Sequence, residues 1–189
     1  QLTYDNPFKS IFTICSDYER ILTFQSCSKT YAMTGWRIGY TCGDQAVIKA
    51  MSKLQGQSTS CPNSIAQFAA CEALSGDQSF VHEMRSAFKK RRDIIVNRLN
   101  AIPGVKCDSP GGAFYVFPNF KEIINRNLDG NIVKSALDLC LMLLEKKSVV
   151  SVSGESFGAE HNIRFSYATS EPVIDYAMNR LEALVKEIC

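Results

Sequence analysis

The chain has 189 residues, of which 46% are hydrophobic and 21% are charged, which is the composition of an ordinary globular protein. The net charge of +2 gives no indication of a nucleic-acid partner, and no apolar run reaches the length that spans a membrane. The eight cysteines form no CxxC pair and only two histidines are present, so we expect no metal site. Because most of these cysteines lie in apolar segments, we expect reduced thiols in a reducing compartment, the cytoplasm, rather than a disulfide framework.

The first part of the chain is predicted to combine two short strands with three helices. Apolar runs and 3.6-residue periodicity indicate, in chain order, strands at 21–25 and 38–42 and helices at 45–55, 62–74 and 79–101. Asp44 and Gly76 are the residue types expected at a helix start and a helix end. The strand at 21–25 is predicted to be buried on both faces. The basic run "KKRRD" at 89–93 is predicted to lie on the solvent side of its helix rather than to bind nucleic acid.

The second part is predicted to contain further strands and two more helices. In chain order these are a strand at 111–117 entered through a glycine turn, a helix at 131–146, strands at 148–153 and 162–168, and a last helix capped by Ser170. Because strands alternate with helices, the sequence favours an α/β fold. The helix at 79–101 is the natural bridge between two lobes.

Lys29 directly follows the first predicted strand. A lysine in a loop is usually a solvated charge. In open α/β sheets, however, ligands bind beyond the carboxyl ends of strands, and the residues that flank Lys29 are small or apolar. We therefore expect its amine to be shielded from water. A shielded amine loses its proton more easily and attacks carbonyl groups, with a Schiff base as the product.

Arg37 lies eight residues after Lys29. Its planar guanidinium suits bidentate binding of a phosphate group. Ser26 and Ser28 add hydroxyl groups, and Gly35 gives the backbone freedom to pass close to a ligand. Together these residues predict a site for an aldehyde that carries a phosphate, and pyridoxal phosphate is the commonest such molecule.

Residues 26–39 resemble the pyridoxal-phosphate attachment motif of the class I aminotransferases. The matching positions are Ser26, Ser28, Lys29, Ala32, Met33, Gly35, Arg37, Ile38 and Gly39. The segments "GQSTSCPNSIAQ", "PGGAFYVFP" and "NIRFSYATS" are similar to the aspartate aminotransferase branch of this family. The resemblance implies that Lys29 forms the Schiff base and then moves a proton, and that Ser26, Ser28 and Arg37 bind the cofactor phosphate.

The resemblance also implies an architecture. Residues 1–85 would be the end of the large cofactor domain of a fold-type I pyridoxal-phosphate-dependent transferase. Residues 86–189 would form the smaller C-terminal α/β domain, with the boundary inside the helix at 79–101.

Arg164 lies in an otherwise apolar predicted strand. An unpaired guanidinium is costly to bury, so we expect an anionic partner, either a carboxylate of the protein or a ligand. The resemblance implies that Arg164 holds the α-carboxylate of the substrate and so orients the bond that is broken. Phe114 either lines the substrate cavity or is a core aromatic residue, and the sequence leaves both interpretations open.

Members of this family are considerably longer than 189 residues. The resemblance implies that an Asp-x-x-Tyr motif, which contacts the cofactor ring, would precede "QLTYDNP". We therefore expect a C-terminal half that is inactive by itself and that belongs to a homodimer when complete. The expected reaction transfers an amino group between an L-amino acid, aspartate or glutamate with aromatic residues as a further option, and a 2-oxo acid. The alternatives are a carbon–sulfur β-lyase or related enzyme on the same scaffold, and a domain that binds cofactor without turnover.

Overall fold

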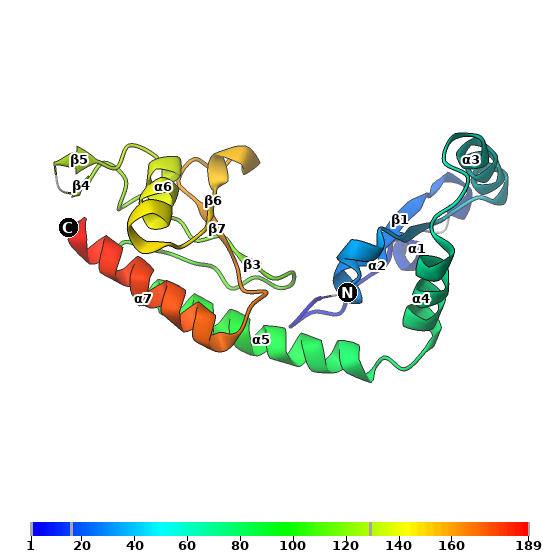
Figure 1. Ribbon diagram of the computed structural model, residues 1–189, viewed down its shortest axis with the longest axis horizontal. Helices are drawn as coiled ribbons and strands as arrows, with labels where there is room; N and C mark the ends of the chain where they lie inside the picture. Colours follow the sequence, from blue (N-terminus) through cyan, green and yellow to red (C-terminus); the bar gives the residue numbers. More distant parts are fainter. Residues whose placement is uncertain (1, 16, 129, 189) are drawn as a thin grey trace. The chain divides into compact units, whose positions relative to one another are not determined.

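The computed structural model describes residues 2–15, 17–128 and 130–188. The chain divides into two compact units, Gln1–Met84 and Arg85–Cys189, and the division lies within helix α5 (Ser79–Asn100). Figure 1 shows the elements of both units. No helix in the described ranges is both long and apolar enough to cross a membrane.

The first unit is built around one antiparallel pair of strands, with helical segments before, between and after them. Its elements are α1 (Ile11–Ile14), η1 (Tyr18–Arg20), β1 (Thr23–Ser26), α2 (Cys27–Thr30), η2 (Thr34–Trp36), β2 (Gly39–Cys42), α3 (Gln45–Ser58) and α4 (Ser64–Ser75). Strands β1 and β2 pair with each other, and Ser26 lies opposite Gly39. The predicted cap of α3 is confirmed, because the Asp44 side chain accepts hydrogen bonds from the amides of Ala46 and Val47.

The prediction that the first strand is buried on both faces is wrong for this chain. In β1 the side chains are half-buried or exposed, and Phe24 is 70% exposed. The apolar run correctly indicated a strand, but β1 pairs only with β2. The burial of a strand depends on the layers packed above and below it, which the run of residues does not encode.

The second unit carries a three-stranded antiparallel sheet in the order β3-β7-β6. Its elements are the main part of α5, then β3 (Tyr115–Val116), β4 (Asn127–Leu128), β5 (Asn131–Ile132), α6 (Ala136–Lys147), β6 (Val152–Ser153), η3 (Gly154–Phe157), β7 (Ile163–Ser166) and α7 (Glu171–Glu187). In the central strand β7, Phe165 pairs with Val116 and Arg164 pairs with Val152.

The two faces of this sheet differ in burial. Ile163 and Phe165 on β7 are buried, whereas Arg164, which points to the opposite face, is only half-buried. Phe165 lines the same small cavity as Ile95 of α5 and Ile174 of α7, so these two helices cover the buried face. The opposite face of the sheet carries Arg164 and the side chains around it.

Several predicted boundaries in this unit need correction, among them the strand predicted at 148–153, which is restricted to Val152–Ser153. The helix predicted at 131–146 begins at Ala136, because Ser135 caps it by accepting a hydrogen bond from the amide of Asp138. Asn131–Ile132 instead forms β5 and pairs with β4. The strand predicted at 111–117 is restricted to Tyr115–Val116, and Ala113 before it adopts a left-handed backbone conformation with φ 62°.

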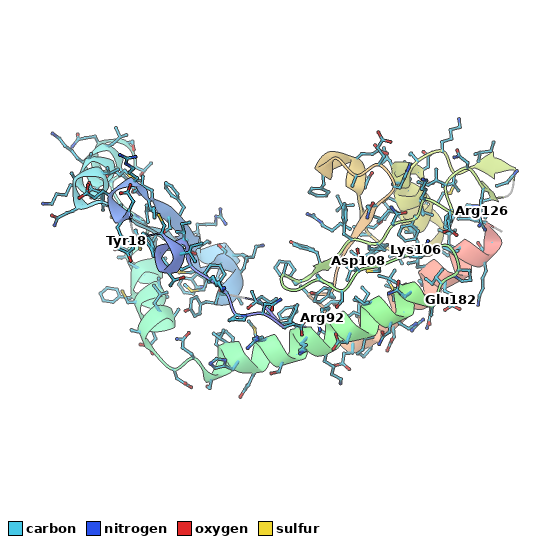
Figure 2. All side chains as sticks on the ribbon, turned by 180° about the vertical axis from the view of Figure 1, so that it is seen from behind. Tyr18, Arg92, Lys106, Asp108, Arg126 and Glu182 are labelled. Atoms are coloured by element: carbon cyan, nitrogen blue, oxygen red, sulfur yellow. The ribbon has the colours of Figure 1, made fainter. Side chains whose placement is uncertain are left out.

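The basic run at 89–93 does not lie wholly on the solvent side of α5. Arg92 is 5% exposed, and its guanidinium donates to the carboxylate of Asp93 and to the carbonyl oxygen of Pro110. Figure 2 shows Arg92 on the helix. Arg92 shares a helical face with the buried Ile95 and Leu99, so the 3.6-residue period places one of the four basic residues inward.

Candidate functional site

Lys29 lies in the single helical turn α2, immediately after β1. The turn begins where the Ser26 hydroxyl accepts a hydrogen bond of 3.1 Å from the amide of Ser28. Cys27, in the same turn, is 1% exposed and fixes the backbone to the core below. Burial raises the pKa of the Cys27 thiol above its ordinary value, and the side chain packs in the buried cluster with Met33 and Ile38.

The hairpin brings Arg37 beside this turn. The pairing of Ser26 with Gly39 continues into a hydrogen bond of 3.3 Å from the Cys27 amide to the Ile38 carbonyl. Arg37 follows η2, which contacts α2, and it adopts a left-handed backbone conformation with φ 51°. The structure therefore brings together four predicted site residues: Ser26, Ser28, Lys29 and Arg37.

Arg37 has a backbone partner but no acidic one. Its Nη1 donates a hydrogen bond of 3.1 Å to the carbonyl of Thr34. Within the described ranges no carboxylate lies at ion-pair distance from this guanidinium. The guanidinium of Arg37 is exposed, and the hairpin pairs the backbone that leads to it with the backbone of the Ser26–Ser28 turn. A guanidinium and hydroxyl groups are the kinds of donor that suit a phosphate ester.

Helix α4 supports the site from behind. Ala66 and Ala70 on this helix form one buried cluster with Cys27, Met33 and Ile38. Small residues at these positions allow the helix to approach the hairpin closely. The site residues are therefore at the surface of the unit, and the backbone that carries them packs against this buried cluster.

The expected shielding of Lys29 is not present in this chain, because its side chain is exposed. The cause is the same as for β1: the hairpin forms a two-stranded sheet, and the described residues of the first unit provide no layer over this end of it. Ser26 and Arg37 are exposed as well, and Ser28 is half-buried.

Arg164 lies against aromatic rings. Its Cζ atom is 4.6 Å from the ring centroid of Tyr115 and 4.7 Å from that of Phe157. In the part of the chain that the structure describes, no carboxylate forms an ion pair with Arg164. Of the two expected kinds of anionic partner, the protein carboxylate is therefore not observed.

Phe114 belongs to an aromatic cluster in the same unit. Its ring centroid lies 4.2 Å from that of Tyr115 and 6.3 Å from that of Phe88. The Phe114 carbonyl accepts a hydrogen bond of 3.0 Å from the amide of Tyr167, whose hydroxyl donates to the Ala113 carbonyl. Phe114 is half-buried, so it contributes to this cluster and keeps part of its surface open.

Sequence reasoning did not single out Phe157. It ends η3, and Gly158 after it takes a left-handed conformation with φ 74°. The Phe-Gly pair marks a turn in the sequence, but a turn by itself does not indicate which distant side chain the phenyl ring will contact. Phe157 and Arg164 become neighbours only when β6 and β7 pair.

The chain belongs to the aminotransferase class I and II family, which matches residues 2–181. It is 46% identical over 167 residues to an aspartate/prephenate aminotransferase of Cereibacter sphaeroides, covering 88% of this chain and 42% of that relative. The crystal structure of the aspartate aminotransferase of Rhizobium meliloti aligns with 100% of the chain and 48% of its own, with a TM-score of 0.94 and 41% identity. An aromatic aminotransferase of Pyrococcus horikoshii aligns with 98% of the chain and 48% of its own, with a TM-score of 0.85 and 34% identity.

These similarities confirm the predicted family and the predicted α/β fold class, that of a fold-type I transferase. Members of the family generally depend on pyridoxal phosphate. The chain spans less than half the length of the relatives to which it is similar.

Proposed function

We propose that this chain is the cofactor-lysine half of an aminotransferase that moves an amino group between an L-amino acid and a 2-oxo acid. Aspartate and glutamate are the proposed amino acids, and aromatic amino acids are the second option. The observation that carries the proposal is the β1–β2 register, because it brings the Lys29 turn beside Arg37 in a chain that matches the family.

We further propose that residues 1–85 end the large cofactor domain and that residues 86–189 form the small domain. The division into compact units after Met84 supports this assignment. A homodimer is proposed for the full-length protein. The shielding that Lys29 lacks in this chain would then be supplied by the remaining parts of that protein.

The residues of the first unit fit pyridoxal phosphate. Ser26, Ser28 and Arg37 would hold its phosphate, and Lys29 would hold its aldehyde carbon. The fit rests on two residues with hydroxyl groups in the turn that the hairpin places beside Arg37, whose guanidinium has no carboxylate partner in the described ranges. When bound, the cofactor withdraws electrons from the substrate Cα and so makes its proton easier to remove.

The proposed work of this chain's own residues is positioning and proton transfer. The Lys29 amine would take the proton from the substrate Cα and return it later in the reaction. Arg164 binds the α-carboxylate through two parallel hydrogen bonds and fixes the orientation of the Cα–H bond. Phe114 is proposed to line the substrate cavity with the open part of its ring.

The test is an absorbance and activity measurement on the full-length protein that contains this chain. With pyridoxal phosphate we expect the visible absorbance of a lysine-bound cofactor, and with glutamate and oxaloacetate we expect 2-oxoglutarate and aspartate. Lys29→Ala should lose both signals. Release of pyruvate and ammonia in place of transamination would instead identify a lyase. A wild-type protein without visible absorbance would contradict cofactor binding.

A further inference from the structure

The open face of the β3-β7-β6 sheet carries one cation among aromatic side chains. Arg164 is half-buried there, with the rings of Tyr115 and Phe157 at 4.6 Å and 4.7 Å from its Cζ atom. We propose that Tyr115 and Phe157 are positioning residues that hold the Arg164 guanidinium ready for a carboxylate. This inference rests on the proposed role of Arg164 in binding the substrate.

The two rings are brought to Arg164 by different parts of the fold. Tyr115 on β3 pairs with Ser166, which lies two residues after Arg164 on the same face of β7. Phe157 comes from the turn between β6 and β7, and its ring contacts that of Phe117 edge to face at 6.0 Å. Neither ring is a sequence neighbour of the arginine.

The turn that carries Phe157 is closed by backbone hydrogen bonds. The Gly154 amide donates to the Asn162 carbonyl at 2.7 Å, and the Ala159 amide donates to the Gly154 carbonyl at 3.0 Å. A Cβ atom at Gly154 would collide with the carbonyl oxygens of Ala159 and Asn162, so the turn is built around this glycine. Phe157 is therefore held by a fixed turn, although half of its side chain is exposed.

The chemistry of the guanidinium explains what two rings can do for it. Its positive charge is attracted to the π faces of aromatic rings, while its N–H donors point outward in its own plane. Contact with two rings restricts the guanidinium without the ion pair that a protein carboxylate would make with those donors. No carboxylate of the described chain forms an ion pair with them. A carboxylate ligand would then meet donors that are already oriented, and less conformational freedom would be lost on binding.

The test compares two amines in the full-length protein loaded with pyridoxal phosphate. Glutamate carries an α-carboxylate, whereas 4-aminobutanoate is the same molecule without it. For each amine, we measure the rate at which the absorbance of the lysine-bound cofactor is lost. The quantity compared is the ratio of the glutamate rate to the 4-aminobutanoate rate. Loss of Arg164 positioning lowers this ratio, whereas general damage to the protein slows both amines and leaves the ratio unchanged.

Phe157→Leu removes the π face and keeps an apolar side chain, and we expect it to lower the ratio about tenfold. The loss should fall mainly on KM for glutamate, with a smaller change in kcat. Phe157→Tyr restores a ring and should restore the ratio, and Tyr115→Phe should leave it unchanged because the ring is kept. Tyr176→Leu is the matched control, since it removes the ring beneath Arg180, another cation–π pair of the same unit.

Two outcomes separate this inference from the proposed function. If Arg164→Lys lowers the ratio and Phe157→Leu does not, the positioning role of Phe157 is overturned and the carboxylate role of Arg164 stands. If Arg164→Lys also leaves the ratio unchanged, the positioning role of Phe157 and the carboxylate role of Arg164 are both overturned. A drop in the ratio for Tyr176→Leu equal to that for Phe157→Leu would likewise overturn the inference, because the effect would not be specific to Arg164.

Discussion

The Nη1 atom of Arg92 donates a hydrogen bond of 3.1 Å to the carbonyl oxygen of Pro110, which ties a buried arginine on α5 to the glycine turn before Phe114. The buried Arg92 side chain makes this hydrogen bond and another to the carboxylate of Asp93, and Arg92→Met removes both. Hydrogen bonds to charged groups contribute more to stability than those between neutral groups. We therefore predict that Arg92→Met lowers the free energy of unfolding by about 1–3 kcal/mol.

Urea unfolding of the 189-residue chain measures this change, with Asn97→Gln as the control on the exposed side of the same helix. The control should change the free energy of unfolding by no more than about 0.5 kcal/mol. Equal effects of the two substitutions would show that the contact with Pro110 contributes nothing specific.

Gly39 allows the close pairing that brings Ser26 and Arg37 together. A Cβ atom at Gly39 would collide with the backbone carbonyl of Gln25 on β1, whereas a Cβ atom at Gly35 would have no neighbour within 4 Å. We predict that Gly39→Ala costs about 1–3 kcal/mol through overpacking, whereas Gly35→Ala changes stability by less than about 0.5 kcal/mol. Urea unfolding of both variants provides the comparison. Equal stability of the two would contradict the prediction.

Glu182 on α7 is expected to make the stability of the second unit depend on pH, because it contacts Lys186 on α7 and Arg98 on α5. Its carboxylate accepts a hydrogen bond of 2.8 Å from Lys186 and lies 3.7 Å from the guanidinium of Arg98 on α5. The bond and the charge of Lys186, and then the charge of Arg98, lower the pKa of Glu182 below its ordinary value of 4.5. Figure 2 shows Glu182 on its helix.

A lowered pKa in the folded state means that the unfolded state binds the proton more readily. The stability from Glu182 is therefore complete above its unfolded pKa and is lost as pH falls through the lower folded value. We predict that wild type exceeds Glu182→Gln in stability at about pH 6 and that the difference shrinks below about pH 4. Urea unfolding of both proteins across this range tests it. A difference that grows on acidification would have the wrong sign.

The cysteines should differ in reactivity according to burial. Burial raises the pKa of Cys107 to about 11, with a smaller effect from the charge of Asp108, whereas Cys71 on α4 is exposed. Because the thiolate is the reactive form, we predict that iodoacetamide at about pH 8 labels Cys71 at least 100-fold faster than Cys107. Mass spectrometry of the labelled peptides measures both rates. In urea the two rates should converge, and a difference that persists there would exclude burial as the cause.

Several features follow from short segments of sequence. The start of α3 was predictable because Asp44 satisfies amides only two and three residues away. The motif around Lys29 was equally readable, because its residues lie within one hairpin and its immediate turn. Ser135 and Asp138 are the residues that start α6, but Ile132 and Val133 before them continue the helical spacing of apolar residues, so that pattern alone extends the helix too far toward the N-terminus.

The tertiary structure alone decided which side chains are covered and which distant groups meet. Arg92 is buried because the segment at Pro110 returns to α5, whereas Lys29 is exposed because the described residues of its own unit place no layer over the end of β1. The neighbours of Arg164 come from β3 and from the turn at Phe157, so strand pairing selects them. Capping and motif spacing act over a few residues, and therefore the sequence determines them directly. Burial and cation–π contacts depend on surfaces that exist only after the chain has folded.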